Sequence, residues 1–352
     1  MEENNQFPYF PGLTINFRSF FFYLITIAAI ILIYSEISEF RLLKEIFLSS
    51  NFFWLATIIL LQVLGYYAMA LNYRDVLRVK DLKVDIRRLF PVTFVIQFLN
   101  QAVPSATLAG QAFFVQYLKK YGLNLAEGIS RAFIELLTLC LAFGLFFFVS
   151  VILLFENGSV AAAPQIAFFI YLFLLVGFIF SIIFFSFQKK KRGAVTKWVI
   201  NKLHRYFEKN KMADHSSHVA MFLDQIRSSF NMQILGRRKK PFFTATLWQG
   251  INLFLNALSL YIIALAIGYP ISFSVAFITF TLTKFLSMVS FVPGGLGVFE
   301  GGMTLVLVSF GVPAQPAFAI TLLLRAFTFW FPMPIGWILF RYILHRQELE
   351  NV

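Results

Sequence analysis

A single arginine lies deep inside a long apolar segment of the sequence, and its charge needs a partner there. Arg325 is about a dozen residues into the segment 314–340, hence near the middle of a helix of about 40 Å. An arginine at that depth costs at least about 2.5–3.5 kcal/mol on insertion, so we expect it to face the protein interior. Glu300, in another apolar stretch, is the expected partner. The pair predicts either a buried lock between two helices or a site for a charged headgroup or ion.

A glycine-rich turn just before Glu300 is suited to an anion. The turn reads Pro293, Gly294, Gly295, Leu296, Gly297. Glycine turns and helix N-termini expose backbone N–H groups and favour anions such as phosphate. Lys284 lies nine residues before the proline, on the arm that leads into the turn, and is expected to face a cavity. These residues predict a site for an anionic group at the turn.

A second set of polar residues occupies the first half of the chain and one later apolar segment. The first-half set is Asn100, Gln101, Gln111, Arg131 and Glu135. Arg131 and Glu135 are four residues apart on one helix face, so a plain intrahelical ion pair is one explanation and a role in the site is the other. The later set is a stripe on one face of the segment 242–267, formed by Gln249, Asn252 and Asn256. Hydrogen bonds between helices explain the stripe by default, and cavity lining is the alternative.

The sequence contains no constellation for catalysis, a metal or a nucleotide. It has no intramembrane histidine, no Asp-x-Asp pair and no Walker or dinucleotide loop. His215 and His218 have helical spacing but no Cys or carboxylate cluster beside them, and Cys140 is the single cysteine. No cofactor, metal or nucleic-acid partner is expected, and an enzyme is not the favoured interpretation.

The elements that position these residues are transmembrane helices. Of the 352 residues 59% are hydrophobic and 13% are charged, against roughly 25% charged residues in a soluble domain, and the mean hydropathy is +0.75. Crossing the hydrocarbon core takes about 20 apolar residues in a helix. Six segments serve as full spans: 17–33, 52–71, 126–155, 165–187, 242–267 and 314–340. The sequence thus predicts an all-α, polytopic transmembrane helical bundle that forms one integral membrane domain over 1–352.

Two further apolar stretches are broken near their middle. Asn, Gln and Pro interrupt the stretch 90–118 at 100–104. The glycine turn 293–297 interrupts the stretch 272–310. Each arm is roughly 12–18 residues long, and several are too short to cross the bilayer. Because irregular backbone survives at membrane depth only where protein buries it or it lines a wet cavity, we expect two re-entrant helical hairpins.

The bases of the chain, whose net charge is +13, gather in a few segments that indicate the topology. The segment 74–88 has six bases and the segment 188–241 has fourteen, whereas 35–48 has two bases and three glutamates. Cytoplasmic loops collect Lys and Arg, so both basic segments and both termini are expected in the cytoplasm of a multi-pass plasma or inner membrane protein. The segment 188–241 is expected to bind anionic headgroups at the membrane surface.

The two hairpins also share a sequence pattern. In both, the proline is followed seven residues later by a polar residue and eighteen residues later by glycine. The next span then contains Arg-Ala-Phe, at 131–133 and at 325–327. With hairpins that enter from opposite sides, this predicts an inverted repeat of about 52–155 and 242–340, a transporter plan whose site lies at the repeat interface.

At these residues the sequence resembles a known family. The motifs that carry the resemblance are Phe291-Val-Pro-Gly-Gly-Leu-Gly-Val-Phe-Glu300, Gly311-Val-Pro, Leu324-Arg325, Trp330-Phe-Pro332 and, more loosely, the basic loop 78–88 and Asn100…Pro104. They are similar to motifs of the lysylphosphatidylglycerol synthase transmembrane region, a flippase-like family, over nearly the whole chain. The segment 105–111 lacks the charge that the family usually carries there. The resemblance implies movement of a phospholipid or polyprenyl-linked lipid between leaflets. The sequence has no lysine-transferring synthetase domain, so we expect no lysyl transfer.

The favoured hypothesis is therefore a lipid flippase or transporter whose substrate headgroup enters between the hairpins while the acyl chains stay in the bilayer. Arg325 and the backbone of 294–297 would hold the phosphate, and Glu300 would pair with Arg325 in the empty site or accept an amine headgroup. Anionic phospholipids, amino-phospholipids and polyprenyl-phosphate-linked lipids are the expected partners, and a homo-oligomer is compatible with the sequence. Two alternatives stay open: a membrane glycosyltransferase-like enzyme acting on polyprenyl-phosphate sugars, and an accessory subunit in envelope-lipid or polysaccharide assembly.

Overall fold

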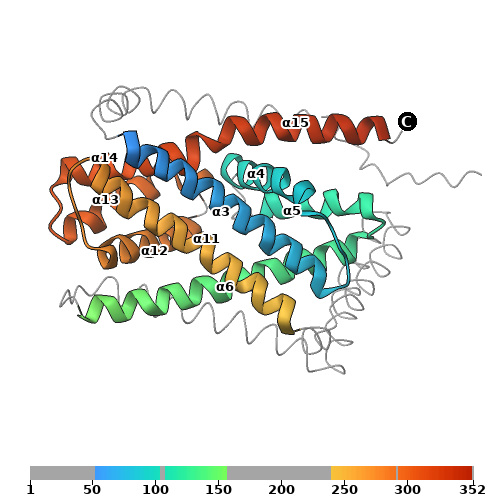
Figure 1. Ribbon diagram of the computed structural model, residues 1–352, viewed down its shortest axis with the longest axis horizontal. Coiled ribbons are helices and arrows are strands. Elements are labelled where there is room, and N and C mark those ends of the chain that lie inside the picture. The colour runs from blue at the N-terminus through green and yellow to red at the C-terminus, as the bar shows by residue number, and fades with distance from the viewer. Residues whose placement is uncertain (1–51, 104–107, 157–238, 291, 351–352) are drawn as a thin grey trace, which may run out of the picture.

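The computed structural model describes residues 52–103, 108–156, 239–290 and 292–350 (Figure 1). The helices are α3 (Phe52–Val79), α4 (Ile86–Ala102), α5 (Leu108–Leu118), α6 (Leu125–Glu156), α11 (Lys239–Ala266), α12 (Phe273–Val289), α13 (Val298–Ser309), α14 (Ala314–Arg325) and α15 (Pro332–Glu350), with the short helices η1 (Lys119–Tyr121), η2 (Pro293–Gly295) and η3 (Ala326–Trp330). Every regular element in these ranges is a helix, which confirms the predicted all-α class.

Four helical segments are long and apolar enough to cross a membrane, as a helical membrane bundle requires. They are Phe53–Val79, Leu125–Phe155, Lys239–Ala266 and Ala314–His345. These segments coincide with four of the six predicted spans. The spans predicted at 17–33 and 165–187, and the basic segment up to residue 238, lie outside the described residues.

Two of the long helices, α3 and α11, form the centre of the bundle. They run side by side along the molecule, with α6 on one side and α15 on the other (Figure 1). Asn252 of α11 donates from Nδ2 to the carbonyl of Gly65 in α3 at 2.8 Å. Because lipid tails are as apolar as leucine, small residues and such hydrogen bonds hold transmembrane helices together. The predicted hydrogen-bonding role of the 242–267 stripe is thus present in this pair.

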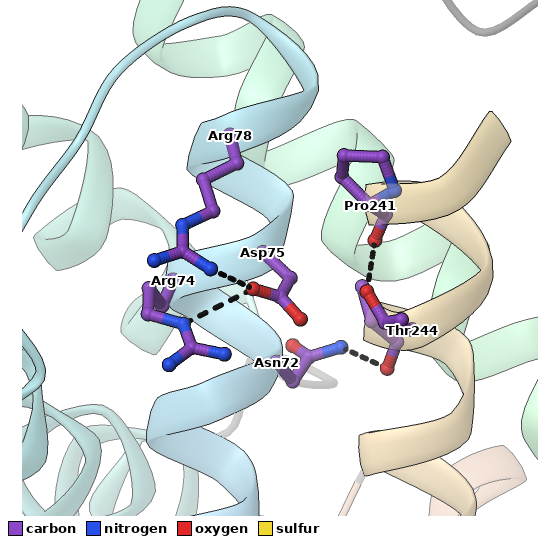
Figure 2. A network of polar contacts seen from close by, with 7 residues as sticks. Asn72, Arg74, Asp75, Arg78, Pro241 and Thr244 are labelled. Atoms are coloured by element: carbon purple, nitrogen blue, oxygen red, sulfur yellow. Dashed lines mark hydrogen bonds and ion pairs between the residues drawn. The ribbon is translucent and has the colours of Figure 1, made fainter. Parts of the chain in front are cut away.

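A polar cluster lies where the end of α3 meets the start of α11 (Figure 2). Asn72 donates from Nδ2 to the Ala245 carbonyl at 2.9 Å, which adds a second tie between the two helices. Within α3, the buried carboxylate of Asp75 accepts from Nε of Arg74 at 3.1 Å and from a terminal nitrogen of Arg78 at 3.3 Å. Two guanidinium groups against one carboxylate leave this end of α3 with a net positive charge, the pattern typical of a cytoplasmic membrane surface.

The first broken stretch folds into the antiparallel pair α4 and α5. At one end of the pair, the hydroxyl of Tyr117 donates to the Arg88 carbonyl at 3.1 Å. At the other end, the amide of Gly110 donates to Oδ1 of Asn100 at 2.8 Å. Asn100 therefore closes the tip of the pair, because its side chain satisfies an amide in the first turn of α5 that has no intrahelical partner.

The second broken stretch folds back through η2 into the pair α12 and α13. Gly294, Gly295 and Gly297 have φ of 58°, 69° and 73°, the left-handed region that glycine adopts at little cost. A Cβ atom on Gly295 would lie 2.0 Å from Oγ of Ser287 in α12. The chain thus reverses over a few residues, and only glycine lets the turn lie against α12.

The tips of the two helix pairs lie against each other. Gln101, near the end of α4, donates from Nε2 to the Thr328 carbonyl in η3 at 3.0 Å. Its own carbonyl would be 3.3 Å from a Cβ atom on Gly294 in η2. The described ends of both interrupted stretches consequently lie against protein, as a break at membrane depth requires. The inverted relation of the two halves stays a prediction.

Helix α15 packs closely against α4 through Gly336, and this contact yields a stability prediction. A Cβ atom at Gly336 would lie 2.6 Å from the Phe94 carbonyl oxygen and 2.5 Å from Cβ of Phe98. Gly336→Ala is expected to push the helices apart and to cost about 1–3 kcal/mol, seen as a lower thermal unfolding midpoint in detergent. Gly301→Ala is the control, because its Cβ would meet nothing within 4 Å and should leave the midpoint unchanged or raised. An unchanged midpoint in Gly336→Ala would contradict the close contact.

Candidate functional site

A polar cavity of about 230 Å³ lies between the two hairpin tips and the central helices. Its walls come from α3, α4, α5, α6, α11 and α12, and from the turn and helix ends around η2 and η3. Nine of the thirteen predicted site residues line it: Asn100, Gln111, Glu135, Gln249, Asn252, Lys284, Gly294, Gly295 and Arg325. The structure therefore brings together residues from both halves of the chain.

The other four predicted residues have different positions relative to the described cavity lining. Glu300 lies behind Arg325, bonded to it. Pro293 begins η2 and Gly297 precedes α13, so both flank the glycines that do line the cavity. Arg131 lies near the start of α6, away from the cavity.

Arg325 has the partner that its depth demands. Its Nε donates to Oε1 of Glu300 at 2.5 Å, and a terminal nitrogen donates to the Gly294 carbonyl at 2.9 Å. The two side chains are buried, with 5% of Arg325 and 7% of Glu300 exposed. The guanidinium carbon also lies 4.2 Å from the ring centroid of Phe329 and 4.9 Å from that of Phe299, which adds cation–π attraction. The predicted pair of Arg325 and Glu300 is confirmed.

The backbone around Arg325 is shaped to receive it. Arg325 ends α14, and the next residues form η3, a π-helical turn closed by a 2.8 Å hydrogen bond from the Phe331 amide to the Ala326 carbonyl. Single π turns within helices occur often at functional sites. A Cβ atom on Gly294 would lie 2.3 Å from a ring carbon of Phe329. Glycine at 294 therefore allows the turn, the aromatic ring and the guanidinium to meet.

The phosphate site expected at the glycine turn stays a prediction, and two hydrogen bonds of the turn bear on it. The Gly295 amide donates to the Val292 carbonyl at 2.9 Å, so this N–H is already used within the turn. The Gly294 carbonyl points to Arg325 and accepts from it. One amide and one carbonyl of the turn are therefore engaged within the protein, and the carbonyl helps to hold Arg325 in place.

Lys284 on α12 is the cation that faces the cavity without a protein partner. Its side chain is half-buried and lines the cavity, as predicted. Within the described part of the chain it makes no hydrogen bond and no ion pair. An ammonium partly withdrawn from water without a counter-charge is costly, so Lys284 is suited to bind an anion that enters the cavity.

Glu135 on α6 lies on the α3 and α5 side of the same cavity. Its Oε2 accepts from Nε2 of Gln111 at 2.5 Å, and the same nitrogen donates to the Tyr73 hydroxyl at 3.3 Å. The ion pair with Arg131, expected as one alternative, is absent among the described residues. Arg131 instead donates to the Glu127 carbonyl at 3.0 Å, because α6 turns Glu135 toward α5 and leaves the arginine near its first turn.

Sequence reasoning missed several cavity residues on α3. Gln62, Gly65, Tyr66, Met69 and Tyr73 line the cavity from this helix. Their spacing of three and four residues places them on one helix face. That spacing was present in the sequence, but no residue in the stripe is charged, so nothing set the stripe apart from an ordinary packed face. Asn256 and Gln101, which the sequence placed in polar sets, also line the cavity.

Arg131 belongs to a small basic cluster beyond the end of α3. Lys80, just outside the spanning helix, donates from Nζ to Oγ of Ser130 at 2.7 Å. Burial, together with the nearby Arg131 guanidinium, lowers the pKa of Lys80 to about 8 against an opposing effect of Glu127. This cluster is separate from the cavity, and it accounts for Arg131 as a structural residue and not as part of the candidate site.

Comparisons with known proteins agree with the architecture. Residues 21–336 match the family described as the lysylphosphatidylglycerol synthase TM region. The chain is 22% identical over 299 residues to a UPF0104 membrane protein of Pyrococcus horikoshii, which covers 83% of this chain and 86% of that protein. It is 22% identical over 311 residues to one of Methanocaldococcus jannaschii, with 87% and 89% covered. A UPF0104 protein of Methanothermobacter thermautotrophicus is 24% identical over 266 residues, with 74% and 76% covered. None of these names states an activity.

The buried ion pair predicts an asymmetry between two cations of the same cavity. Arg325→Met leaves the Glu300 carboxylate buried without its partner, which should cost about 3–5 kcal/mol and lower the thermal unfolding midpoint. The double variant Arg325→Met/Glu300→Met removes both charges and should regain most of the loss. Lys284→Met is the matched control, because no ion pair is broken there. Equal losses from the two single variants would contradict the pairing.

The lowered pKa of Lys80 predicts a pH dependence of stability. The unfolded chain holds a proton on this lysine with a pKa near the ordinary 10.5, whereas the folded chain holds it near 8. The Lys80 contribution is therefore least favourable below pH 8 and rises as the pH increases from about 8 to about 10.5. Unfolding midpoints measured over this range should show the rise in the wild type and lose it in Lys80→Met. The exposed Lys83→Met is the control, and parallel curves for wild type and Lys80→Met would refute the assignment.

Proposed function

Because the chain belongs to the lysylphosphatidylglycerol synthase transmembrane-region family, we propose that it moves a lipid with an anionic, phosphate-containing headgroup between the two leaflets of a membrane. The substrate class is a phospholipid or a polyprenyl-linked lipid. The observation that carries the proposal is a cavity with many polar side chains within a bundle of apolar helices, on whose wall Lys284 forms no ion pair with any described residue.

A lipid headgroup needs such a chamber because hydrocarbon solvates it poorly. Moving an unpaired charge into an apolar medium costs far more than moving one that meets an opposite charge and hydrogen-bonding groups. Lys284 supplies the charge, and amide side chains such as Gln249 and Asn256 supply hydrogen bonds. Arg325 adds positive potential but is held in place by Glu300, so it shapes the site without leaving its partner.

The size and rim of the cavity favour a headgroup over a whole lipid. A volume of about 230 Å³ lies below the roughly 300–1,000 Å³ of pockets that enclose drug-sized ligands. Val292 lines the cavity and is also 37% exposed, which gives the opening an apolar edge beside η2. The headgroup then occupies the chamber while the acyl chains stay outside, against apolar surface.

A translocation assay tests the proposal. Purified protein in proteoliposomes should make fluorescent phosphatidylglycerol in the inner leaflet accessible to dithionite faster than empty vesicles do. Lys284→Met should lower that rate at least tenfold because the headgroup loses its counter-charge. Lys83→Met, an exposed lysine outside the cavity, is the matched control and should keep the wild-type rate.

Two outcomes would count against transport. Absence of translocation above empty vesicles for anionic, amine-bearing and polyprenyl-phosphate lipids alike would overturn the proposed function. A donor-dependent lipid product formed by the purified protein would favour the enzyme alternative instead.

A further inference from the structure

The cavity wall carries two charged groups that no protein group of opposite charge neutralises. On α12, Lys284 makes no ion pair within the described residues. On α6, Glu135 is buried, with 4% of its surface exposed, and its described hydrogen-bond partner is the neutral amide of Gln111. The third cavity charge, Arg325, is offset by Glu300. The charges of these four groups therefore sum to zero, although Lys284 and Glu135 form no ion pair with each other.

We propose that Glu135 is a proton-binding site, and that it takes up a proton when the anionic headgroup occupies the cavity. This inference rests on the proposed function and adds to it the ion that accompanies the lipid. A phosphodiester beside Lys284 brings one negative charge into a chamber that already holds the Glu135 carboxylate. Because uncompensated charge is costly in a low-dielectric interior, protonation of Glu135 restores neutrality.

The surroundings of Glu135 can serve both of its protonation states. In the present arrangement, Nε2 of Gln111 donates to the carboxylate. The other amide atom, Oε1 of Gln111, is buried and has no hydrogen-bond partner. A turn of the amide would let Oε1 accept from a protonated Glu135, while Nε2 is the donor for the ionised form. The orphaned oxygen is thus accounted for by a second state of the same pair.

No other charged group in the described part of the chain neutralises Glu135 from the helices that pack on it. From α3 the facing group is Tyr73, and from α5 it is Gln111. From α11 and α12 the cavity groups are the neutral Gln249 and Lys284, and Lys284 forms no ion pair with Glu135. Arg131, on the same helix, donates to the Glu127 carbonyl instead. Occupation of the Lys284 end is therefore the event that changes the potential at Glu135.

Coupling of this kind is reciprocal. If the bound headgroup favours protonation of Glu135, then protonation must favour the bound headgroup by the same factor. A lipid would be taken up more readily on the side of the membrane with the lower pH and released more readily on the other. The pair of Lys284 and Glu135 thus links headgroup movement to a proton gradient.

Calorimetry on the purified full chain in detergent tests the inference. Short-chain phosphatidylglycerol is the probe, because its phosphodiester does not titrate near neutral pH. Titrations in two buffers of different ionisation enthalpy should show uptake of up to one proton per bound lipid. As the pH is raised through the range in which Glu135 titrates, the affinity for the lipid should fall by up to tenfold per pH unit, because at most one proton is linked to binding. Glu135→Gln should bind with no uptake and with a flat pH dependence.

The controls separate this inference from the proposed function. Glu127→Gln, an acid on the same helix outside the cavity, should keep the uptake. Lipid binding by the wild type without proton uptake would overturn the inference and leave the proposed function standing, and this measurement needs no variant. Tenfold tighter binding of short-chain phosphatidylethanolamine, lost in Glu135→Gln, would make Glu135 an amine site and also overturn it. Absence of binding and translocation of every lipid would overturn the proposed function, and the inference with it.

Discussion

The structure around the cavity depends on neutralising one guanidinium in an apolar interior. Arg325 is 5% exposed, so its charge must be met largely by the protein, and three elements meet it. Glu300 comes from the start of α13, the Gly294 carbonyl comes from η2, and the ring of Phe329 comes from η3. Because removal of any of these groups would leave a buried charge partly unmet, the second helix pair is held to the last span at a defined position.

That position in turn determines where the two interrupted backbones meet. The glycines of η2 let the second turn lie against Phe329, and Gln101 of α4 bonds to the neighbouring Thr328 carbonyl. The described ends of the two breaks therefore lie against each other or against the π turn. Since unsatisfied backbone does not survive in hydrocarbon, the meeting of the tips is what allows a polar chamber at this depth. The cavity is thus a consequence of how the polar backbone groups at the two breaks are accommodated.

The sequence predicts the parts of this arrangement that depend on local composition. Four spans and the pairing of Arg325 with Glu300 were predictable, because the cost of a charge in hydrocarbon belongs to the residue itself and leaves few partners. The direction in which the Glu135 side chain points could not be predicted from the sequence. It depends on the rotation of α6 against α5, which spacing alone does not determine, and that rotation replaced a pair with Arg131 by a bond to Gln111. The phosphate site at the glycine turn stays a prediction, because spacing alone does not show which amides bond within the turn, as the Gly295 amide does.

The charges of the cavity divide into two kinds, and the division bears on function. Arg325 and Glu300 neutralise each other's charge, so their ion pair holds the elements that carry them in place. A ligand that displaced either group would have to replace that ion pair. Within the described residues, Lys284 and Glu135 form no ion pair, and Arg325 adds a like charge near Lys284, so these two groups contribute less to the stability of the fold. A protein under selection for stability alone would pair or replace such groups, because buried charges without partners are costly. Their presence in one cavity agrees with the proposed partners that come and go, an anion at Lys284 and a proton at Glu135.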